Sequence, residues 1–434
     1  MNIIQLIDKK KNNQILTKEE IEYIINGYVS GEIKDYQMSA LLMAICFNGM
    51  NSDETAILTE TMKNTGEVFD LSGINKITVD KHSTGGVGDK VTIILLPIMA
   101  SLNIPMLKMS GRGLGFTGGT ADKLESFEGF NMDYTLDEAI KMVNKYNICE
   151  MTQSNKMCLA DKKIYELRGL TSTIDSIPLI ASSIMSKKLA VGCDKILLDV
   201  TCGNGAFASN IEDARELAKQ MVDIGNKNGK ETIAVITNMD EPLGKSIGNS
   251  LEIIEAIEFL KGRCEEDVLE VIKTLGAYIL KLAEVSDDIE KNKEIIEEQI
   301  FNGKAYQKFI QWIQVQGGNI NQIEDISLLP KAKEILFVTT NENGYISKIN
   351  SKAIGELVNK IGGGRNRKGE EIDHSVGIIL NYKVGDYVEN GATLAYIHVN
   401  DYGNKEELIK EVRSAFEITE NKTEKMKMIL DVIM

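Results

Sequence analysis

The chain has 434 residues, of which 43% are hydrophobic and 26% are charged, so it is neither a disordered nor a fibrous protein. Its length predicts two or three domains. The 49 basic and 64 acidic side chains give a formal net charge of −15, which argues against nucleic acid or an anionic membrane as the main partner. A local pocket can still bind a small phosphate ligand.

The sequence gives no sign of a membrane segment. Its longest apolar run, from Val91 to Ala100, is about half the length of a membrane span. At the amino terminus the basic cluster follows a short apolar stretch, which is the reverse of a secretory signal. We therefore expect a cytoplasmic protein.

Six cysteines lie far apart in the sequence, with no Cys-x-x-Cys pair and only three histidines beside them. A structural zinc site needs closely spaced nitrogen and sulfur ligands, so none is expected. The cysteines are interpreted as buried thiols. His374 and His398 are interpreted as structural residues.

The first 66 residues predict a small bundle of helices. Thr17 and Glu20 form a capping-box pattern, and apolar residues from Ile21 to Tyr28 then recur on one helix face. Two further periodic stretches cover residues 36–47 and 52–64. Short, closely connected helices of this kind are typical of a bundle.

Strands and helices then alternate, which predicts an α/β domain with a mostly parallel sheet over residues 67–161 and 194–330. The expected strands cover residues 77–79, 105–109, 195–200 and 232–237. The expected helices between them cover residues 91–101, 136–146 and 211–224.

A helix expected at residues 177–191 interrupts this alternation. We expect residues 162–193 to return to the helical domain, which makes that domain discontinuous. Beyond Pro330, strands at 334–340 and 344–348 flank an Asn343-Gly344 turn, and residues 331–434 predict a smaller C-terminal α+β domain. The predicted class is α/β, with a discontinuous all-helical domain, a larger α/β domain and this C-terminal module.

Glycines concentrate in two loops, each of which follows an expected strand. Residues 81–120 contain eight of the 37 glycines, in the loops 81–90 and 110–120. Such loops turn backbone N–H groups towards a ligand, and a following helix start favours an anion. Hydroxyl and ammonium groups in and beside the loops add charge-assisted donors for phosphate: Lys81, Ser83, Thr92, Lys108, Ser110 and Thr120.

Two other interpretations of these loops remain open at this point. Gly113-x-Gly115-x-x-Gly118, with Asp133 further on, matches a dinucleotide-binding pattern, but a single match is weak and leaves the first loop unused. The glycines could also serve only as turns between strands and helices.

Three longer stretches carry a resemblance: KHSTGGVGDK, KMSGRGLGFTGGTADKLES and SIPLIASSIMSKK. Together they resemble the pyrimidine-nucleoside and thymidine phosphorylase family over nearly the whole chain. The resemblance implies phosphorolysis of uridine, deoxyuridine or thymidine by inorganic phosphate, giving the free base and a pentose 1-phosphate in nucleoside salvage. A thymidine-restricted enzyme is the alternative within the family. The resemblance also implies a homodimer formed through the helical domain.

The resemblance assigns roles to individual residues. Phosphate contacts fall on the six donors named above, and base contacts fall on Arg168, Ser183 and Lys187. Ser183 and Lys187 are four residues apart, so they share one helix face. His82, Arg168 and Lys187 are the catalytic candidates, and whether His82 transfers a proton stays open because phosphate is already a competent nucleophile.

The resemblance implies no organic cofactor, but it implies a potassium site. Gly88, Leu243, Ser246 and Glu255 stand at the ligand positions, and Lys90 stands where the family usually has a hydroxyl residue. Either Lys90 pairs with Glu255 and replaces the metal, or it points to solvent and potassium remains. We expect the first, because a buried Glu255 needs a positive partner.

Three segments depart from the family pattern. Phe116 replaces a usual histidine, Met157-Cys158-Leu159 replaces Leu-Thr-Pro, and the loop 201–207 lacks its usual Lys-Thr/Val. These changes leave the substrate preference open.

Two rival functions share single features with this chain. The stretch from Lys383 to Leu394 resembles the hammerhead of biotinyl and lipoyl carriers, but no modifiable lysine motif accompanies it. An anthranilate-type phosphoribosyltransferase has a similar pair of loops and would hold magnesium through a pair such as Asp240-Glu241.

Overall fold

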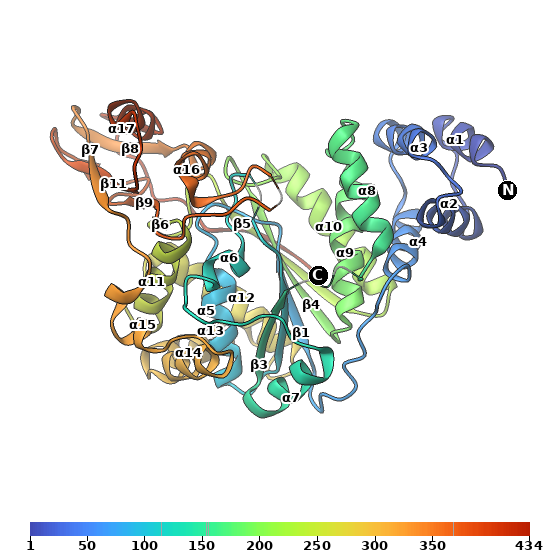
Figure 1. Ribbon diagram of the computed structural model, residues 1–434, viewed down its shortest axis with the longest axis horizontal. Helices are drawn as coiled ribbons and strands as arrows, with labels where there is room; N and C mark the ends of the chain where they lie inside the picture. Colours follow the sequence, from blue (N-terminus) through green and yellow to red (C-terminus); the bar gives the residue numbers. More distant parts are fainter. Residues whose placement is uncertain (114, 153, 155, 368) are drawn as a thin grey trace.

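The computed structural model describes residues 1–434 apart from 114, 153, 155 and 368, so Leu114 of the second glycine loop lies outside the described residues. The chain forms a helical bundle, an α/β domain and a C-terminal module. In Figure 1 the bundle and the C-terminal module lie on opposite sides of the α/β domain. The predicted fold class is confirmed.

The helical bundle is discontinuous, as predicted. Thr17 Oγ1 accepts a hydrogen bond from Glu20 N, and Glu20 Oε2 accepts one from Thr17 N at 2.7 Å, which starts the second helix. The chain leaves after four helices and returns with two more. The six helices are α1 (Ile3–Lys11), α2 (Lys18–Ser30), α3 (Asp35–Asn48), α4 (Ser52–Lys63), α8 (Leu159–Leu170) and α9 (Ile177–Val191).

Helix α9 belongs to two cores. Leu179 packs in the core of the bundle, whereas Ala181, Met185 and Leu189 pack against the sheet of the α/β domain. A side chain on α9 can therefore reach the bundle or the sheet, depending on its face.

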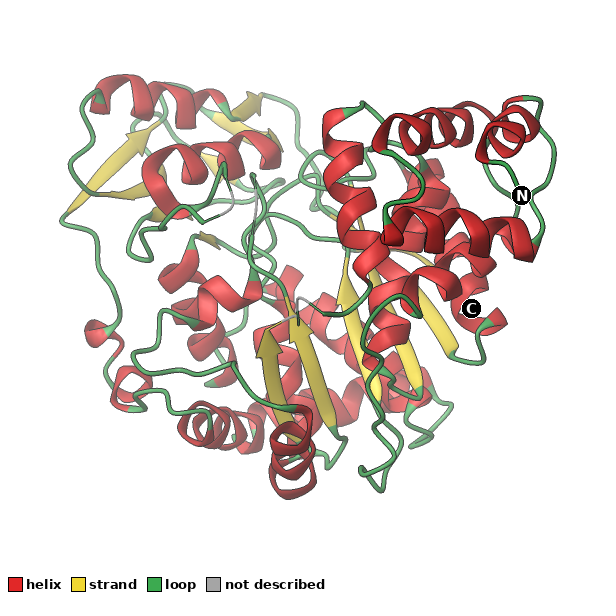
Figure 2. Ribbon diagram, turned by 45° about the vertical axis from the view of Figure 1, so that its right-hand side comes forward, coloured by secondary structure: helices red, strands yellow, loops and turns green. Residues whose placement is uncertain are grey.

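The main sheet of the α/β domain has four strands and is mostly parallel, as predicted, and a separate parallel pair of strands lies beside it. β1 (Val79–Ser83), β4 (Lys195–Cys202) and β5 (Glu231–Asn238) are parallel, and β2 (Met106–Ser110) pairs in parallel with β3 (Ile148–Thr152). These strands stand side by side in the middle of the molecule (Figure 2). The helices of this domain are α5 (Val91–Ser101), α6 (Thr120–Leu124), α7 (Leu136–Tyr146), α10 (Ile211–Lys227), α11 (Asn249–Leu260), α12 (Glu266–Leu282), α13 (Ile289–Phe301), α14 (Lys304–Val315), α15 (Asn321–Glu324) and the 3-10 turn η1 (Ile326–Leu328).

The sheet differs from the prediction at two places. The strand expected at 77–79 spans Val79–Ser83, because Asp80 and Lys81 are buried through ion pairs and so hide the apolar signal of a strand. The last strand, β13 (Ile429–Ile433), pairs antiparallel with β5. The end of the chain therefore belongs to the α/β sheet and not to the C-terminal domain expected at 331–434.

The C-terminal module contains two small antiparallel sheets. β7 (Glu334–Thr339) and β8 (Gly344–Ile349) lie in different sheets, so the turn at Asn343-Gly344 connects two sheets instead of closing the expected hairpin. β6 (Ser246–Ile247), from the α/β part, pairs with β9 (Gly377–Leu380) and joins the module to that part. The remaining elements are β10 (Tyr387–Val388), β11 (Thr393–Val399), β12 (Phe416–Thr419), α16 (Ser351–Val358), the π-helical turn η2 (Asn359–Gly363) and α17 (Lys405–Ser414).

The topology brings the two glycine loops together. β1 ends at Ser83 and β2 ends at Ser110, and the two strands are neighbours in space. Ligands of open α/β sheets bind at the carboxyl ends of such strands.

The apolar run that begins at Val91 forms the buried helix α5 in the core of this domain. None of the described helices combines the length and the apolar composition needed to span a membrane. Four of the six cysteines are buried, whereas Cys46 and Cys264 are partly exposed.

Candidate active site

A cleft of about 260 Å³ opens where the two glycine loops meet helix α9. Most of the predicted phosphate-binding and catalytic residues line it. The predicted phosphate contacts Ser83, Thr92, Lys108, Ser110 and Thr120 lie on its wall, together with His82 and Lys187. The cleft therefore brings together ammonium, hydroxyl and imidazole groups from the α/β domain and from α9.

Close backbone packing explains part of the glycine content of the loops. A Cβ atom on Gly119 would lie 2.1 Å from the backbone nitrogen of Gly113, so the two ends of the second loop pack backbone against backbone. Gly113 N also donates to Asp122 Oδ2 at 2.7 Å. In the first loop, Gly88 has a φ of +75°, and a Cβ atom there would lie 2.6 Å from the carbonyl oxygen of Leu243.

Lys81 does not line the cleft, although the sequence predicts it as a phosphate contact. It is fully buried beneath the first loop, where its Nζ lies 3.0 Å from Asp199 Oδ2. Asp199 faces Ser83 in the parallel register of β1 and β4 and also accepts a hydrogen bond from Thr237 Oγ1 at 2.7 Å. The ion pair with Asp199 on the neighbouring strand therefore holds the Lys81 side chain beneath the residues that line the cleft.

Lys188 is a cationic residue of the cleft that sequence reasoning missed. Its Nζ donates to Asp80 Oδ2 at 2.8 Å, and Lys108 Nζ lies 3.7 Å from the other oxygen of the same carboxylate. Burial and the charge of Lys188 lower the pKa of Lys108 to about 8. The only sequence signal for Lys188 was its place next to Lys187.

Glu150 lies on β3 directly opposite Lys108 in the parallel register with β2. It is fully buried, and neither carboxylate oxygen has a hydrogen-bond partner among the described residues. Burial raises the pKa of Glu150 to about 8, so this carboxyl group is protonated at neutral pH. Sequence reasoning missed it because β3 was not predicted.

His82 lines the cleft between the phosphate donors and α9. Its Nε2 has no hydrogen-bond partner within the described part of the chain. Burial, and then the charges of Lys188 and Lys108, hold the pKa of His82 well below its ordinary value of 6.5. The imidazole is therefore neutral at pH 7 and can donate or accept one hydrogen bond.

Helix α9 presents Lys187 to the cleft. Its Nζ forms an ion pair with Asp161 of α8 and lies 3.2 Å from Ser183 Oγ, one helical turn away. Asp161 is buried and was not predicted, although it stands in the Ala-Asp-Lys-Lys stretch that precedes Arg168. The pair fixes the ammonium group at the edge of the cleft.

Arg168 and Ser183 lie outside the cleft and line a separate cavity of about 30 Å³ in the core of the bundle. The guanidinium group of Arg168 donates to the backbone carbonyl oxygens of Thr173 at 2.9 Å, Ile174 at 2.7 Å and Leu179 at 3.1 Å. It thus connects the end of α8 to the start of α9. Two of its five N–H groups remain for a ligand.

The three departures from the family pattern have different environments. Phe116 packs against the hydrophobic core of the C-terminal module, and Lys352 Nζ lies 5.7 Å from the centre of its ring. Met157 lines the cleft. Thr201, in the third departing loop, bonds to Thr84 of the first glycine loop, with its hydroxyl 2.9 Å from that of Thr84.

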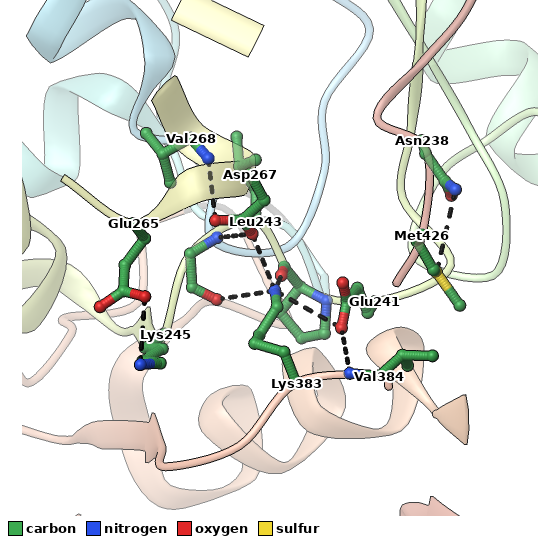
Figure 3. Close-up of polar contacts among 12 residues, drawn as sticks. Asn238, Glu241, Leu243, Lys245, Glu265, Asp267, Val268, Lys383, Val384 and Met426 are labelled. Atoms are coloured by element: carbon green, nitrogen blue, oxygen red, sulfur yellow. Dashed lines mark hydrogen bonds and ion pairs between the residues drawn. The ribbon is translucent and has the colours of Figure 1, made fainter. Parts of the chain in front are cut away.

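The pair Asp240-Glu241 does not line the cleft. Asp240 Oδ1 accepts a hydrogen bond from Asn204 N at 2.8 Å, and Glu241 Oε2 accepts one from Val384 N at 3.0 Å. Figure 3 shows Glu241 turned towards the C-terminal module, beside Lys383. Glu241 therefore supports the junction with the C-terminal module, whereas Asp240 supports a loop of the α/β domain.

The residues of the expected potassium site also lie at this junction. Lys90 is fully buried, and its Nζ lies 2.8 Å from Glu255 Oε2, 2.6 Å from the carbonyl oxygen of Leu243 and 3.2 Å from that of Ser246. The carbonyl oxygen of Gly88 accepts a hydrogen bond from the backbone nitrogen of Lys90 at 2.9 Å. The described residues contain no group of three histidine, cysteine or acidic side chains that could hold a metal ion.

Three stretches of the chain match known families. Residues 4–66 match the helical bundle domain of a glycosyl transferase family, and residues 75–306 match its a/b domain. Residues 345–419 match the pyrimidine nucleoside phosphorylase C-terminal domain.

Similar proteins cover nearly the whole chain. The pyrimidine-nucleoside phosphorylase of Geobacillus stearothermophilus is 50% identical over 400 residues, which are 92% of each chain. That of Bacillus subtilis is 50% identical over 412 residues, or 95% of each chain, and that of Staphylococcus haemolyticus is 47% identical over 418 residues, or 96% of each. The crystal structure of anthranilate phosphoribosyltransferase from Thermus thermophilus has a TM-score of 0.57 at 15% identity and covers 71% of this chain and 98% of its own, which shows a shared fold.

Proposed function

The chain belongs to the pyrimidine-nucleoside phosphorylase family, and on that premise we propose that it cleaves pyrimidine nucleosides with inorganic phosphate. The products are a free base and a pentose 1-phosphate, and uridine, deoxyuridine and thymidine are the proposed substrates in nucleoside salvage. One observation carries this proposal. Five phosphate-type donors of the two glycine loops share a single cleft with Lys187 of α9.

The cleft residues can divide the reaction between them. Ser83, Thr92, Lys108, Ser110 and Thr120 bind the phosphate, which is itself the nucleophile and needs no general base. One phosphate oxygen forms a bond to C1′ of the sugar while the bond from C1′ to the base nitrogen breaks. The electron pair of that bond leaves with the base.

Lys187 stabilises the departing base. A pyrimidine anion spreads charge over its ring nitrogen and carbonyl oxygens, and a fixed cation stabilises this charge most strongly as the bond breaks. The pair with Asp161 and the contact with Ser183 hold the ammonium group in place. Neutral His82, at the same cleft, donates a hydrogen bond to the base or the sugar.

Arg168 takes part only when its two free N–H groups reach the base. The guanidinium group lies in the bundle, outside the cleft, so movement of the bundle towards the α/β domain must bring it to the substrate. We therefore propose that the cleft closes during the reaction, which brings the reacting atoms to about 3–3.5 Å.

We also propose a homodimer formed through the helical bundle. Ile15, Tyr36 and Phe47 are large hydrophobic side chains of the bundle with 62%, 73% and 81% of their surface exposed. Sedimentation at micromolar concentration tests this, and a monomer would contradict it.

Incubation with substrates tests the reaction directly. We expect uracil and ribose 1-phosphate from uridine only when phosphate is present, with equal amounts of both products. Incubation with phosphoribosyl pyrophosphate and anthranilate is the matched alternative. If product forms in this second mixture and none forms from uridine and phosphate, the chain is a phosphoribosyltransferase and the proposed phosphorylase activity is wrong.

A further inference from the structure

Lys90 places a cation inside a ring of oxygen atoms that is not part of the cleft. Three groups form this oxygen cage: the carbonyl oxygens of Leu243 and Ser246 and the carboxylate of Glu255. All three lie within 2.6–3.2 Å of Lys90 Nζ. Backbone carbonyls and carboxylates are the ligands that hard cations prefer, so a cage of this composition attracts a positive charge.

The cage is closely packed around the ammonium group. Gly244 lies between the two carbonyl residues with a φ of +69°, and a Cβ atom there would lie 2.8 Å from Lys90 Nζ and 2.4 Å from Glu255 Oε1. Backbone nitrogens of Lys245 and Ser246 donate to the Glu255 carboxylate at 2.8 Å each. The carboxylate is thus held in one orientation, and its single cationic partner within the described residues is Lys90.

A separate metal ion does not fit these residues. The ammonium group already lies at hydrogen-bonding distance from oxygens of Leu243, Ser246 and Glu255, which are three of the four residues expected to ligate a monovalent ion. A second cation in the same place would be repelled by its charge. Burial acts to lower the pKa of Lys90, but the carboxylates of Glu255 and Glu252 outweigh it and raise the pKa above its ordinary value, so the group is protonated at neutral pH.

The oxygen cage lies between the start of α5 and the strand β6. Lys90 occupies the position just before α5, whose first turn carries Thr92 of the cleft. Gly88 packs against Leu243 beside it. Ser246 begins β6, which pairs with β9 of the C-terminal module. The cage therefore connects the first glycine loop to the junction with the C-terminal module.

We propose that Lys90 acts as a built-in monovalent cation, so that this enzyme needs no potassium for its fold or its activity. The ammonium group on its own side chain does the work of a dissolved ion, and it is always present. This goes beyond the proposed reaction, because it concerns the ion requirement of the fold and can be measured without substrate.

The test compares thermal stability in potassium chloride, ammonium chloride and choline chloride at one ionic strength. Wild-type protein should have the same Tm and the same turnover in all three salts. A Tm of the wild type that rises in potassium above its value in choline would overturn the proposal.

Two variants show whether the cage itself recognises a cation. Lys90→Ser opens the cage and leaves Glu255 without a partner, so its Tm should fall in choline and rise by about 2–4 °C when potassium or ammonium replaces it. Lys90→Met removes the charge but fills the space, so its Tm should be low in all three salts. A folded Lys90→Ser protein with no response to either ion would also overturn the proposal. If Lys90→Ser fails to fold, the wild-type comparison and a Glu255→Gln variant decide. The Tm of Glu255→Gln should be the same in the three salts. A higher Tm of Glu255→Gln in potassium than in choline would count against the proposal.

Discussion

The ammonium group of Lys81 and the carboxylate of Asp199 lie 3.0 Å apart beneath the first glycine loop, and both side chains are buried. The pair connects two neighbouring parallel strands, since Lys81 is on β1 and Asp199 is on β4. In the proposed reaction, Lys81 can act on phosphate only through its charge, from beneath the loop. Direct contact would require the loop to move.

Loss of one partner of this pair should be costly. Asp199→Asn removes the closest counter-charge of the buried Lys81 ammonium group, and we expect the free energy of unfolding to fall by about 3–5 kcal/mol. Urea denaturation measures this change. The double variant Lys81→Met/Asp199→Leu should recover most of the loss, because two apolar side chains leave no charge unpaired. A double variant that is no more stable than Asp199→Asn would contradict this account.

Lys187→Met should lower turnover by about 10²-fold and leave the KM for phosphate nearly unchanged, because in the proposed reaction the ammonium group acts on the departing base. Steady-state kinetics at varied phosphate and saturating uridine measure both values. Lys162→Met is the matched control, since Lys162 is exposed on α8 next to Asp161, and its kinetics should stay at the wild-type level. A large rise in the KM of Lys187→Met for phosphate would instead mean that Lys187 binds the phosphate.

Arg168→Lys should affect stability and turnover together. The guanidinium group bonds to three backbone carbonyls between α8 and α9, and a lysine cannot replace this planar set of donors. We expect a lower Tm and a turnover reduced by at least about tenfold, because the remaining N–H groups, which the proposed reaction assigns to the base, are lost as well. If Tm falls while turnover of the folded enzyme stays normal, Arg168 is a structural residue only.

How far the sequence predicted this molecule depended on how local the signal was. The helix at Leu136–Tyr146 was predicted to the residue, because Thr135 and Glu138 cap its start and Asn147 ends it in a left-handed conformation. The glycine loops were recognised because their residues are contiguous. Most of the donors expected from them do line one cleft.

Features that depend on distant parts of the chain were missed. Strand register and ion pairs between elements determine the surroundings of Glu150, Asp199 and Lys188. Such long-range contacts leave no periodic pattern in the sequence. The strand β13 was missed for the same reason. Its partner β5 lies about 190 residues earlier, and only tertiary packing brings the two together.

Phosphate binding should weaken as the pH rises through about 8. Lys108, with a pKa of about 8, then loses its positive charge, and Glu150, with a pKa of about 8, gains a negative one. Asp80, Lys81 and Lys188 are the other charged groups that face them. Both changes act against an anion, so the KM for phosphate should rise between pH 7 and 9.

Glu150→Gln separates the two groups. Since glutamine cannot ionise, the rise of the phosphate KM with pH should be smaller in this variant than in the wild type. The sign for stability is also fixed. The pKa of Glu150 is higher in the folded protein than its ordinary value of about 4.5 in the unfolded chain. The protonated carboxyl group therefore makes its full contribution to the stability of the fold below pH 4.5 and loses it as the pH rises towards 8. Equal pH profiles of KM in the two proteins would exclude Glu150 from the effect.

Two ion pairs, one buried and one exposed, connect helix α12 to the C-terminal part of the chain. Lys383 extends from the module to Asp267, with 2.9 Å between Nζ and Oδ2, and both side chains are 13% exposed. Figure 3 shows its ammonium group among Asp267, Glu241 and the backbone near Leu243, the loop that also forms the oxygen cage. Lys425 and Glu266 form the second pair at 2.6 Å, with 66% and 83% of their side chains exposed.

Double-mutant cycles on the two pairs should give different coupling energies. For Lys383→Met with Asp267→Asn we expect about 1–3 kcal/mol, because the pair is largely shielded from water and Asp267 also accepts a hydrogen bond from Gly244 N at 2.8 Å. For Lys425→Met with Glu266→Gln we expect below about 1 kcal/mol, because solvent screens an exposed pair. Urea denaturation of the four variants in each cycle gives both energies. Equal coupling energies in the two cycles would mean that burial does not decide the strength of this junction.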